Sequence, residues 1–128
     1  MGGLHPGGAT RLFSLFDCPA AGAICYEIAD GSTLALATAE GADWLLSIAN
    51  LDPYPLQRQQ QFLALAQLRA IESGRDLLSV ANTGPTALIS ADGHVERLLP
   101  PMQAGLATVT LQLREEVGFY PWLVSMLR

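Results

Sequence analysis

A cysteine, a tyrosine and a glutamate stand in a row where a short apolar run ends. The run is Gly22-Ala23-Ile24, and Cys25, Tyr26 and Glu27 follow it directly. A strand that stops there exposes the side chain at its tip, and a thiolate at a strand-to-helix corner can form a thioester. Backbone N–H groups at such a corner can stabilise an oxyanion. Cys25 is therefore the candidate nucleophile, with Tyr26 and Glu27 in support.

Less specific interpretations of these residues stay open. A free cysteine is most often a buried, small apolar side chain. Glu27 is either a solvated loop carboxylate or a polar partner near the thiol. Cys18 falls in a predicted turn and is expected to be unreactive. Two cysteines and two histidines match no common zinc spacing, so we expect neither a metal site nor a cofactor.

The elements that position Cys25 follow from hydrophobic patterns. The run at residues 44–50 is apolar throughout and predicts a strand covered on both faces, in the middle of a sheet. A long helix with a wide apolar face is predicted over 55–73, because Leu65, Leu68 and Ile71 recur every three residues with Leu63, Ala66 and Ala70 beside them, and Gly74 ends it. Ser32 is the predicted N-cap of a short helix that ends at Gly41. Further strands are predicted at 11–16, 22–25, 77–81, 86–90, 94–99 and, from strict alternation, 107–114.

This order predicts an α/β fold with roughly seven strands and two helices in one mixed sheet. The helices lie on one face, and the other face remains apolar and uncovered, which favours self-association. Residues 1–10 lack periodicity and are expected to be a flexible segment, so the domain covers residues 11–128.

Charge and hydropathy exclude several partners. The net charge is −5, with seven arginines and no lysine, so the sequence offers no basic face for nucleic acid. No apolar run approaches the roughly 18–20 residues that cross a bilayer, and the first residues do not form a signal peptide. The 128 residues by themselves are expected to be soluble or peripheral. Tyr120 and Trp122 either face lipid headgroups or pack on the sheet.

Motifs in a fixed order resemble a known family. They are Ile24-Cys25-Tyr26-Glu27, Gly41 to Leu46, Leu68 to Arg75 and Ala81-Asn82-Thr83-Gly84, followed by Asp92-Gly93. Together they are similar to the carbon-nitrogen hydrolase (nitrilase) superfamily, and within it to the apolipoprotein N-acyltransferase branch. The likeness runs from about residue 11 to about residue 122.

The resemblance implies a fold and an activity. The family's catalytic domain is an α-β-β-α sandwich, of which this chain would form the C-terminal half. Members lie in the bacterial inner membrane with the hydrolase domain in the periplasm, and they transfer a phospholipid acyl chain through a cysteine thioester to the N-terminal amine of lipoproteins. Cys25 falls at the nucleophile position, with Tyr26 and Glu27 as required neighbours. Asn50 and Tyr54 lie in the loop that would contact substrate.

The sequence departs from the family pattern upstream of Cys25. The family triad places a glutamate and a lysine before the cysteine, whereas Asp17 is the only acidic residue there and no lysine occurs. The isolated chain is therefore expected to be inactive. The alternatives are a soluble amidase fragment completed by a partner chain and a non-catalytic remnant.

Two polar features have alternative interpretations. Arg69 and Glu72 are either an exposed ion pair or, as the resemblance implies, a link between helix and sheet. Asn82 either caps a turn or supports the nucleophile loop.

Overall fold

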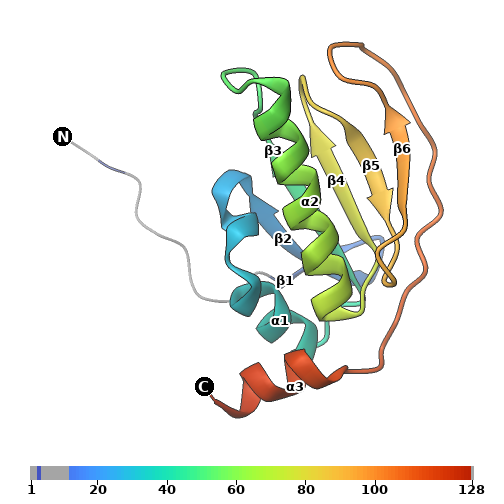
Figure 1. The fold of residues 1–128 in the computed structure, drawn as a ribbon. Helices are drawn as coiled ribbons and strands as arrows, with labels where there is room; N and C mark the ends of the chain where they lie inside the picture. The colour runs from blue at the N-terminus through green and yellow to red at the C-terminus, as the bar shows by residue number, and fades with distance from the viewer. Residues whose placement is uncertain (1–2, 4–11, 128) are drawn as a thin grey trace.

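The computed structural model describes residue 3 and residues 12–127, and in it one mixed sheet carries helices on one face (Figure 1). The strands are β1 (Leu12–Leu15), β2 (Cys18–Ile24), β3 (Trp44–Ala49), β4 (Leu77–Ala81), β5 (Thr86–Ile89) and β6 (Val95–Leu99). The helices are η1 (Cys25–Ala29, a 3-10 turn), α1 (Gly31–Ala39), α2 (Leu56–Ser73) and α3 (Phe119–Met126). The predicted α/β class is confirmed.

The strands lie in the order β1-β2-β3-β4-β5-β6. The three central strands β2, β3 and β4 are parallel, and the outer pairs are antiparallel hairpins. The apolar run predicted to lie mid-sheet is β3, which pairs on both sides. Its predicted cover on both faces is wrong for the described residues, because Ile48 is 48% exposed on the face away from the helices. Because parallel strands end at the same edge, the segments that follow β2, β3 and β4 meet there.

The core lies between the sheet and helices α1 and α2. Alternate side chains of β2, β3 and β4 pack on the helices, because strand side chains alternate between faces. The fully buried members include Ala21, Leu45, Leu77, Leu34 and Ala70. The long helix ends as predicted, since Gly74 has φ 62° and ψ 37°, a left-handed conformation that suits glycine. Its backbone N–H donates to the last turn of α2.

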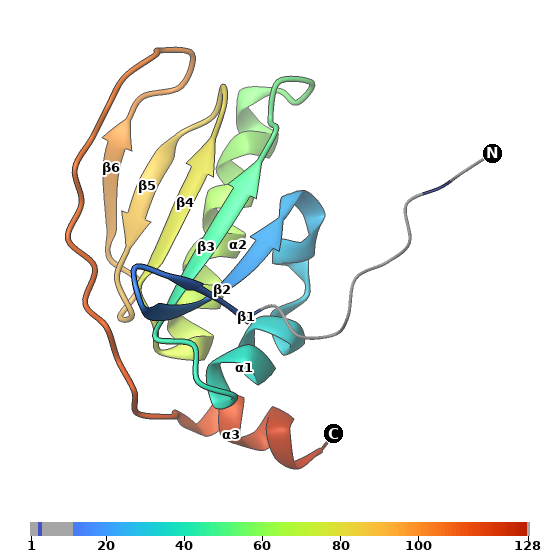
Figure 2. The same ribbon diagram turned by 180° about the vertical axis from the view of Figure 1, so that it is seen from behind.

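The opposite face of the sheet is apolar and open. Phe13, Ile24 and Ile48 stand on this face, and their side chains are 37%, 67% and 48% exposed. Figure 2 shows that, within residues 12–127, no helix lies over this side. The predicted uncovered face is therefore present in the described part of the chain.

We expect the 128-residue chain to self-associate through this open face. A contiguous apolar patch larger than a few hundred Å² usually marks an interaction surface. Light scattering after size exclusion should show oligomers, and Ile48→Lys, which places a charge in the patch, should reduce them. A parent chain that remains a monodisperse monomer and binds no dye for apolar surfaces would contradict this expectation.

Several predictions about the secondary-structure elements are wrong. Residues 107–114 form no strand, although their side chains alternate, because in this segment no neighbouring strand pairs with them. The described residues thus contain six strands rather than about seven, and a third α-helix, α3, lies where only an apolar tail was expected. The second strand also begins earlier than predicted, so Cys18 pairs with Leu15 and the turn is Phe16-Asp17, both with positive φ.

The predicted N-terminal segment, residues 1–10, lies outside the described residues except for Gly3. Helix α3 packs on α1 below the sheet (Figure 1), and its Trp122 ring lies 5.9 Å from that of Phe119, with half of the Trp122 side chain exposed. Among the described helices, none is both long and apolar enough to cross a membrane.

Candidate functional site

Cys25 stands at a sharp corner of the backbone. Strand β2 ends at Ile24, and Cys25 has φ 54°, a left-handed value that is rare for a residue with a Cβ. Its side chain is half-buried and forms no disulfide. The element that begins at Cys25 is a 3-10 helix of five residues, too short to contribute much of a helix dipole to the thiol.

Glu27 braces this corner. One carboxylate oxygen accepts a hydrogen bond of 2.7 Å from the backbone N–H of Ile24, the residue before Cys25. The contact ties the end of β2 to the 3-10 turn, as a carboxylate three residues into a helix often does. Glu27 is thus neither simply solvated nor, through this oxygen, a partner of the thiol.

Tyr26 and Tyr54 lie together beside the corner. Their ring centroids are 6.1 Å apart, and the ring of Phe62 from α2 lies 5.3 Å from Tyr26 and 6.1 Å from Tyr54. The loop after β3 and the helix α2 therefore bring the predicted substrate-contacting Tyr54 next to Tyr26. Tyr26 keeps half of its side chain exposed.

The two hydroxyls are electrostatically distinct. Hydrogen bonding to Tyr54 and then to Arg58 lowers the pKa of Tyr26 from its ordinary value. The same hydrogen bond to Tyr26 is the main cause that raises the pKa of Tyr54. A negative charge on Cys25 would raise the pKa of both, so the thiol lies within electrostatic reach of both rings. In the sequence, nothing marks Arg58 as a site residue except its place in the first turn of a predicted helix.

Asn82 joins the loops that follow β3 and β4. Its carbonyl oxygen accepts hydrogen bonds from the backbone N–H groups of Leu51 and Thr83, both at 2.9 Å. Its amide nitrogen donates to the Asn50 side-chain oxygen at 2.8 Å. Asn82 therefore caps a turn and supports the neighbouring loop at once. The Asn50 oxygen, predicted to contact substrate, is already held by Asn82 and by the N–H of Asp52.

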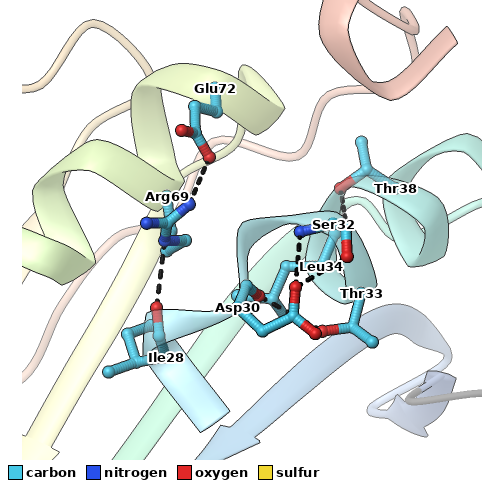
Figure 3. Close-up of polar contacts among 8 residues, drawn as sticks. All are labelled: Ile28, Asp30, Ser32, Thr33, Leu34, Thr38, Arg69 and Glu72. Carbon is cyan, nitrogen blue, oxygen red and sulfur yellow. Dashed lines mark hydrogen bonds and ion pairs between the residues drawn. The ribbon is translucent and has the colours of Figure 1, made fainter. Parts of the chain in front are cut away.

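Arg69 of α2 links this helix to the 3-10 turn that begins with Cys25 (Figure 3). Its side chain is about 8% exposed, its Nε donates to the Ile28 carbonyl at 3.0 Å, and its Nη1 pairs with Glu72 at 2.6 Å. Gly31 leaves room for this pair, because a Cβ there would lie 1.9 Å from Nη1. The pair is therefore a link between the long helix and the 3-10 turn that begins with Cys25. The exposed-pair interpretation is wrong.

The N-cap of α1 is Asp30 rather than the predicted Ser32. The Asp30 carboxylate accepts hydrogen bonds from the backbone N–H of Ser32 at 3.0 Å and from its hydroxyl at 2.6 Å (Figure 3). The hydroxyl contact is the main cause that lowers the pKa of Asp30. Asp30 thus separates the 3-10 turn from α1 and directs the chain away from Cys25.

We expect Asp30→Ala to lower the free energy of unfolding by about 1 kcal/mol at neutral pH, the usual cost of losing an N-cap. The pKa of Asp30 is lower in the folded chain than in the unfolded chain. The stability that the Asp30 cap contributes is therefore complete at pH values above the unfolded-state pKa, and it is lost as the pH falls through the folded-state pKa. Denaturant titrations of parent and variant should therefore converge at acid pH. The exposed loop residue Asp52, changed to Ala, is the control, and an equal loss at both pH values would contradict the cap assignment.

The sequence matches the profile of a known protein family. The profile of the family described as carbon-nitrogen hydrolase matches residues 4–118. No cluster of metal-ligating side chains occurs among the described residues.

Several curated relatives carry the name apolipoprotein N-acyltransferase. The protein from Parasynechococcus marenigrum is 63% identical over 124 residues, which is 97% of this chain and 27% of the relative. A Prochlorococcus marinus protein (strain MIT 9313) is 54% identical over 94% of this chain and 24% of its own length. The protein from Shewanella oneidensis is 37% identical over 71% of this chain and 18% of its own length. The chain thus spans about a quarter or less of these relatives.

Solved structures share the fold. An amidase from Nesterenkonia sp. superposes with a TM-score of 0.65 over 92% of this chain and 45% of the amidase, at 19% identity. A carbon-nitrogen hydrolase from Helicobacter pylori G27 gives a TM-score of 0.61 over 71% of this chain and 40% of that chain, at 13% identity. The sheet and its helices therefore match part of the nitrilase-superfamily fold.

Proposed function

The chain belongs to the carbon-nitrogen hydrolase family, and we propose that its 128 residues form the nucleophile-bearing part of an apolipoprotein N-acyltransferase. The observation that supports this is Cys25, held at positive φ just beyond a central parallel strand, within a stretch 63% identical to a protein of that name. The name of this relative gives the activity that we propose, and the backbone corner at Cys25 supplies a thiol suited to acyl transfer. The membrane location of the family is part of the same proposal.

The proposed reaction consists of two half-reactions. In the first, the Cys25 thiolate attacks the carbonyl carbon of a phospholipid ester, a C–S bond forms and the C–O bond breaks, and the lysophospholipid leaves as the alcohol after taking a proton. In the second, the N-terminal amine of a lipoprotein attacks the thioester. The C–N bond forms, the C–S bond breaks, and the nitrogen gives up a proton as the thiolate returns.

The residues around Cys25 have separate tasks in this scheme. The positive φ turns the thiol out of the strand, and Glu27 and Arg69 hold the turn in that position. The first backbone N–H groups of a helical turn lack intrahelical partners, so those of η1 are suited to an oxyanion. Tyr26 and Tyr54 contact each other and lie within electrostatic reach of the thiol.

The scheme also needs groups that these 128 residues do not carry. The sequence contains no lysine, and Asp17 is the only acidic residue before Cys25. We propose that the carboxylate base and the lysine come from residues outside this stretch, and that the stretch alone does not turn over. The open apolar sheet face is suited to pack against that remainder.

A segment exchange tests the function directly. The matched 124-residue stretch of the Parasynechococcus relative is replaced by the corresponding residues of this chain, and acyl transfer from phospholipid to a lipopeptide is followed by mass spectrometry. We expect an active chimera and an acyl adduct on Cys25, and a loss of at least about 10³-fold in rate for Cys25→Ala. A folded but inactive chimera would contradict the proposed function.

The isolated chain tests the second part of the proposal. Incubated with the same donor and acceptor, it should show no turnover. Ready acylation and transfer by the isolated chain would contradict the view that the base and the lysine lie elsewhere.

A further inference from the structure

A cation stands among the aromatic side chains beside Cys25. Arg58 lies in the first turn of α2, one turn before Phe62, so both side chains leave the helix on the same side. The Phe62 ring contacts Tyr26 and Tyr54, and the hydroxyl of Tyr26 interacts with both Tyr54 and the Arg58 guanidinium. Its place on α2 and the ring contacts of Phe62 therefore put Arg58 beside Tyr26 and Tyr54, next to Cys25 in the chain.

The charge of Arg58 is not neutralised locally. Within the described part of the chain no carboxylate forms an ion pair with it, whereas Arg69 on the same helix is paired with Glu72. Arg58 and Tyr26 are both solvent-exposed, so an incoming group can reach them. A guanidinium with the Tyr26 hydroxyl beside it as a further donor matches the oxygens of a phosphate group, and Tyr54 orients that hydroxyl by donating to it. Neither an amine nor a neutral acyl chain would use this combination.

We propose that Arg58, Tyr26 and Tyr54 form an anion-binding subsite beside Cys25 that takes the phosphate group of the acyl donor. This deepens the proposed acyl-transfer function and rests on it. Binding of the phosphate there would hold the ester carbonyl of the donor near the thiol. After the first half-reaction the lysophospholipid would dissociate from these same contacts.

Thiol labelling tests the subsite without requiring catalysis. The full 128-residue chain is treated with iodoacetate, which is anionic, and with neutral iodoacetamide, and Cys25 and Cys18 are quantified separately by peptide mass spectrometry. For Arg58→Gln we expect the iodoacetate-to-iodoacetamide rate ratio at Cys25 to fall by about threefold to tenfold, the effect of removing one nearby cation at a protein surface. The ratio should also fall with added salt in the parent.

Matched controls isolate the cause. Arg97→Gln removes an exposed arginine on β6 and should leave the Cys25 ratio unchanged, and Cys18 should not respond to Arg58→Gln. Tyr26→Phe should lower the ratio less than Arg58→Gln, because it removes a hydroxyl but no charge. Equal effects of Arg97→Gln and Arg58→Gln, or no effect of either, would overturn the proposal. Circular dichroism confirms that each variant folds.

The source of the phosphate is tested by protection. Dihexanoyl phosphatidylglycerol should slow iodoacetamide labelling of Cys25 at concentrations where dihexanoylglycerol, which lacks phosphate, does not, and Arg58→Gln should abolish this protection. Equal protection by inorganic phosphate would overturn the assignment to a lipid headgroup. Protection that survives Arg58→Gln would overturn the subsite itself. A failed segment exchange with an intact labelling result would overturn the acyl-transfer function alone.

Discussion

Arg69→Met should lower the free energy of unfolding by about 2–4 kcal/mol, the cost of leaving buried polar partners without a donor. The variant keeps most of the apolar length of the side chain but removes the donor to the Ile28 carbonyl and the cation beside Glu72. Ile28 is fully buried, so its carbonyl is not readily compensated by water. Denaturant titration measures the loss, and hydrogen exchange should locate it in the 3-10 turn from Cys25 to Ala29.

Arg58→Met on the same helix is the matched control. It removes the same chemical group from an exposed position, where substitutions usually change stability by no more than about 0.5 kcal/mol. Gly31→Ala probes the same link from the other side, because the added Cβ would displace the Arg69 guanidinium. Similar small losses for Arg69→Met and Arg58→Met would show that Arg69 does not hold the turn.

The scaffold around the site could be predicted because its signals are local. The apolar run of β3 reflects its place inside the sheet, and Gly74 marks a helix end by its left-handed backbone. The three-residue apolar spacing predicted the helix α2 but not its buried face, because Leu68 and Ile71 are 44% and 50% exposed. The side chains that α2 buries include Phe62, Leu63 and Ala66. The corner at Cys25 could also be predicted, since a strand pattern stops there. Its left-handed φ could not, because nothing in Ile24-Cys25-Tyr26 favours that conformation by residue type.

Features that depend on distant residues escaped prediction. Arg69 bonds to a carbonyl 41 residues away, and a single arginine in an amphipathic helix carries no sign of such a partner. The proximity of Arg58 and Tyr26 likewise depends on how α2 crosses the sheet. The strand predicted from the alternation in residues 107–114 is absent for a related reason. A strand needs a paired neighbour as well as a pattern, and in this structure the segment passes beside β6 without a ladder (Figure 2).

That segment is held instead by two buried charges at the amino end of β4. We call residues 100–118 the C-terminal strap. Asp76, 3% exposed, accepts hydrogen bonds from the backbone N–H groups of Ala91 at 3.0 Å and Gln112 at 2.9 Å, one on each carboxylate oxygen. Arg75, 1% exposed, donates to the carbonyls of Ala42 and Glu116. Burial lowers the pKa of Arg75 from its ordinary value.

Asp76→Asn should therefore lower the free energy of unfolding by about 2–3 kcal/mol, although the two side chains have the same shape. An amide has one acceptor oxygen, so its NH₂ group must face either the Ala91 or the Gln112 N–H, and that donor loses its partner. If the Gln112 contact is lost, limited proteolysis should cut the strap sooner than in the parent. Asp52→Asn, in an exposed loop, should change neither stability nor cleavage. An Asp76→Asn chain as stable and as protease-resistant as the parent would mean that the Arg75 contacts alone hold the strap.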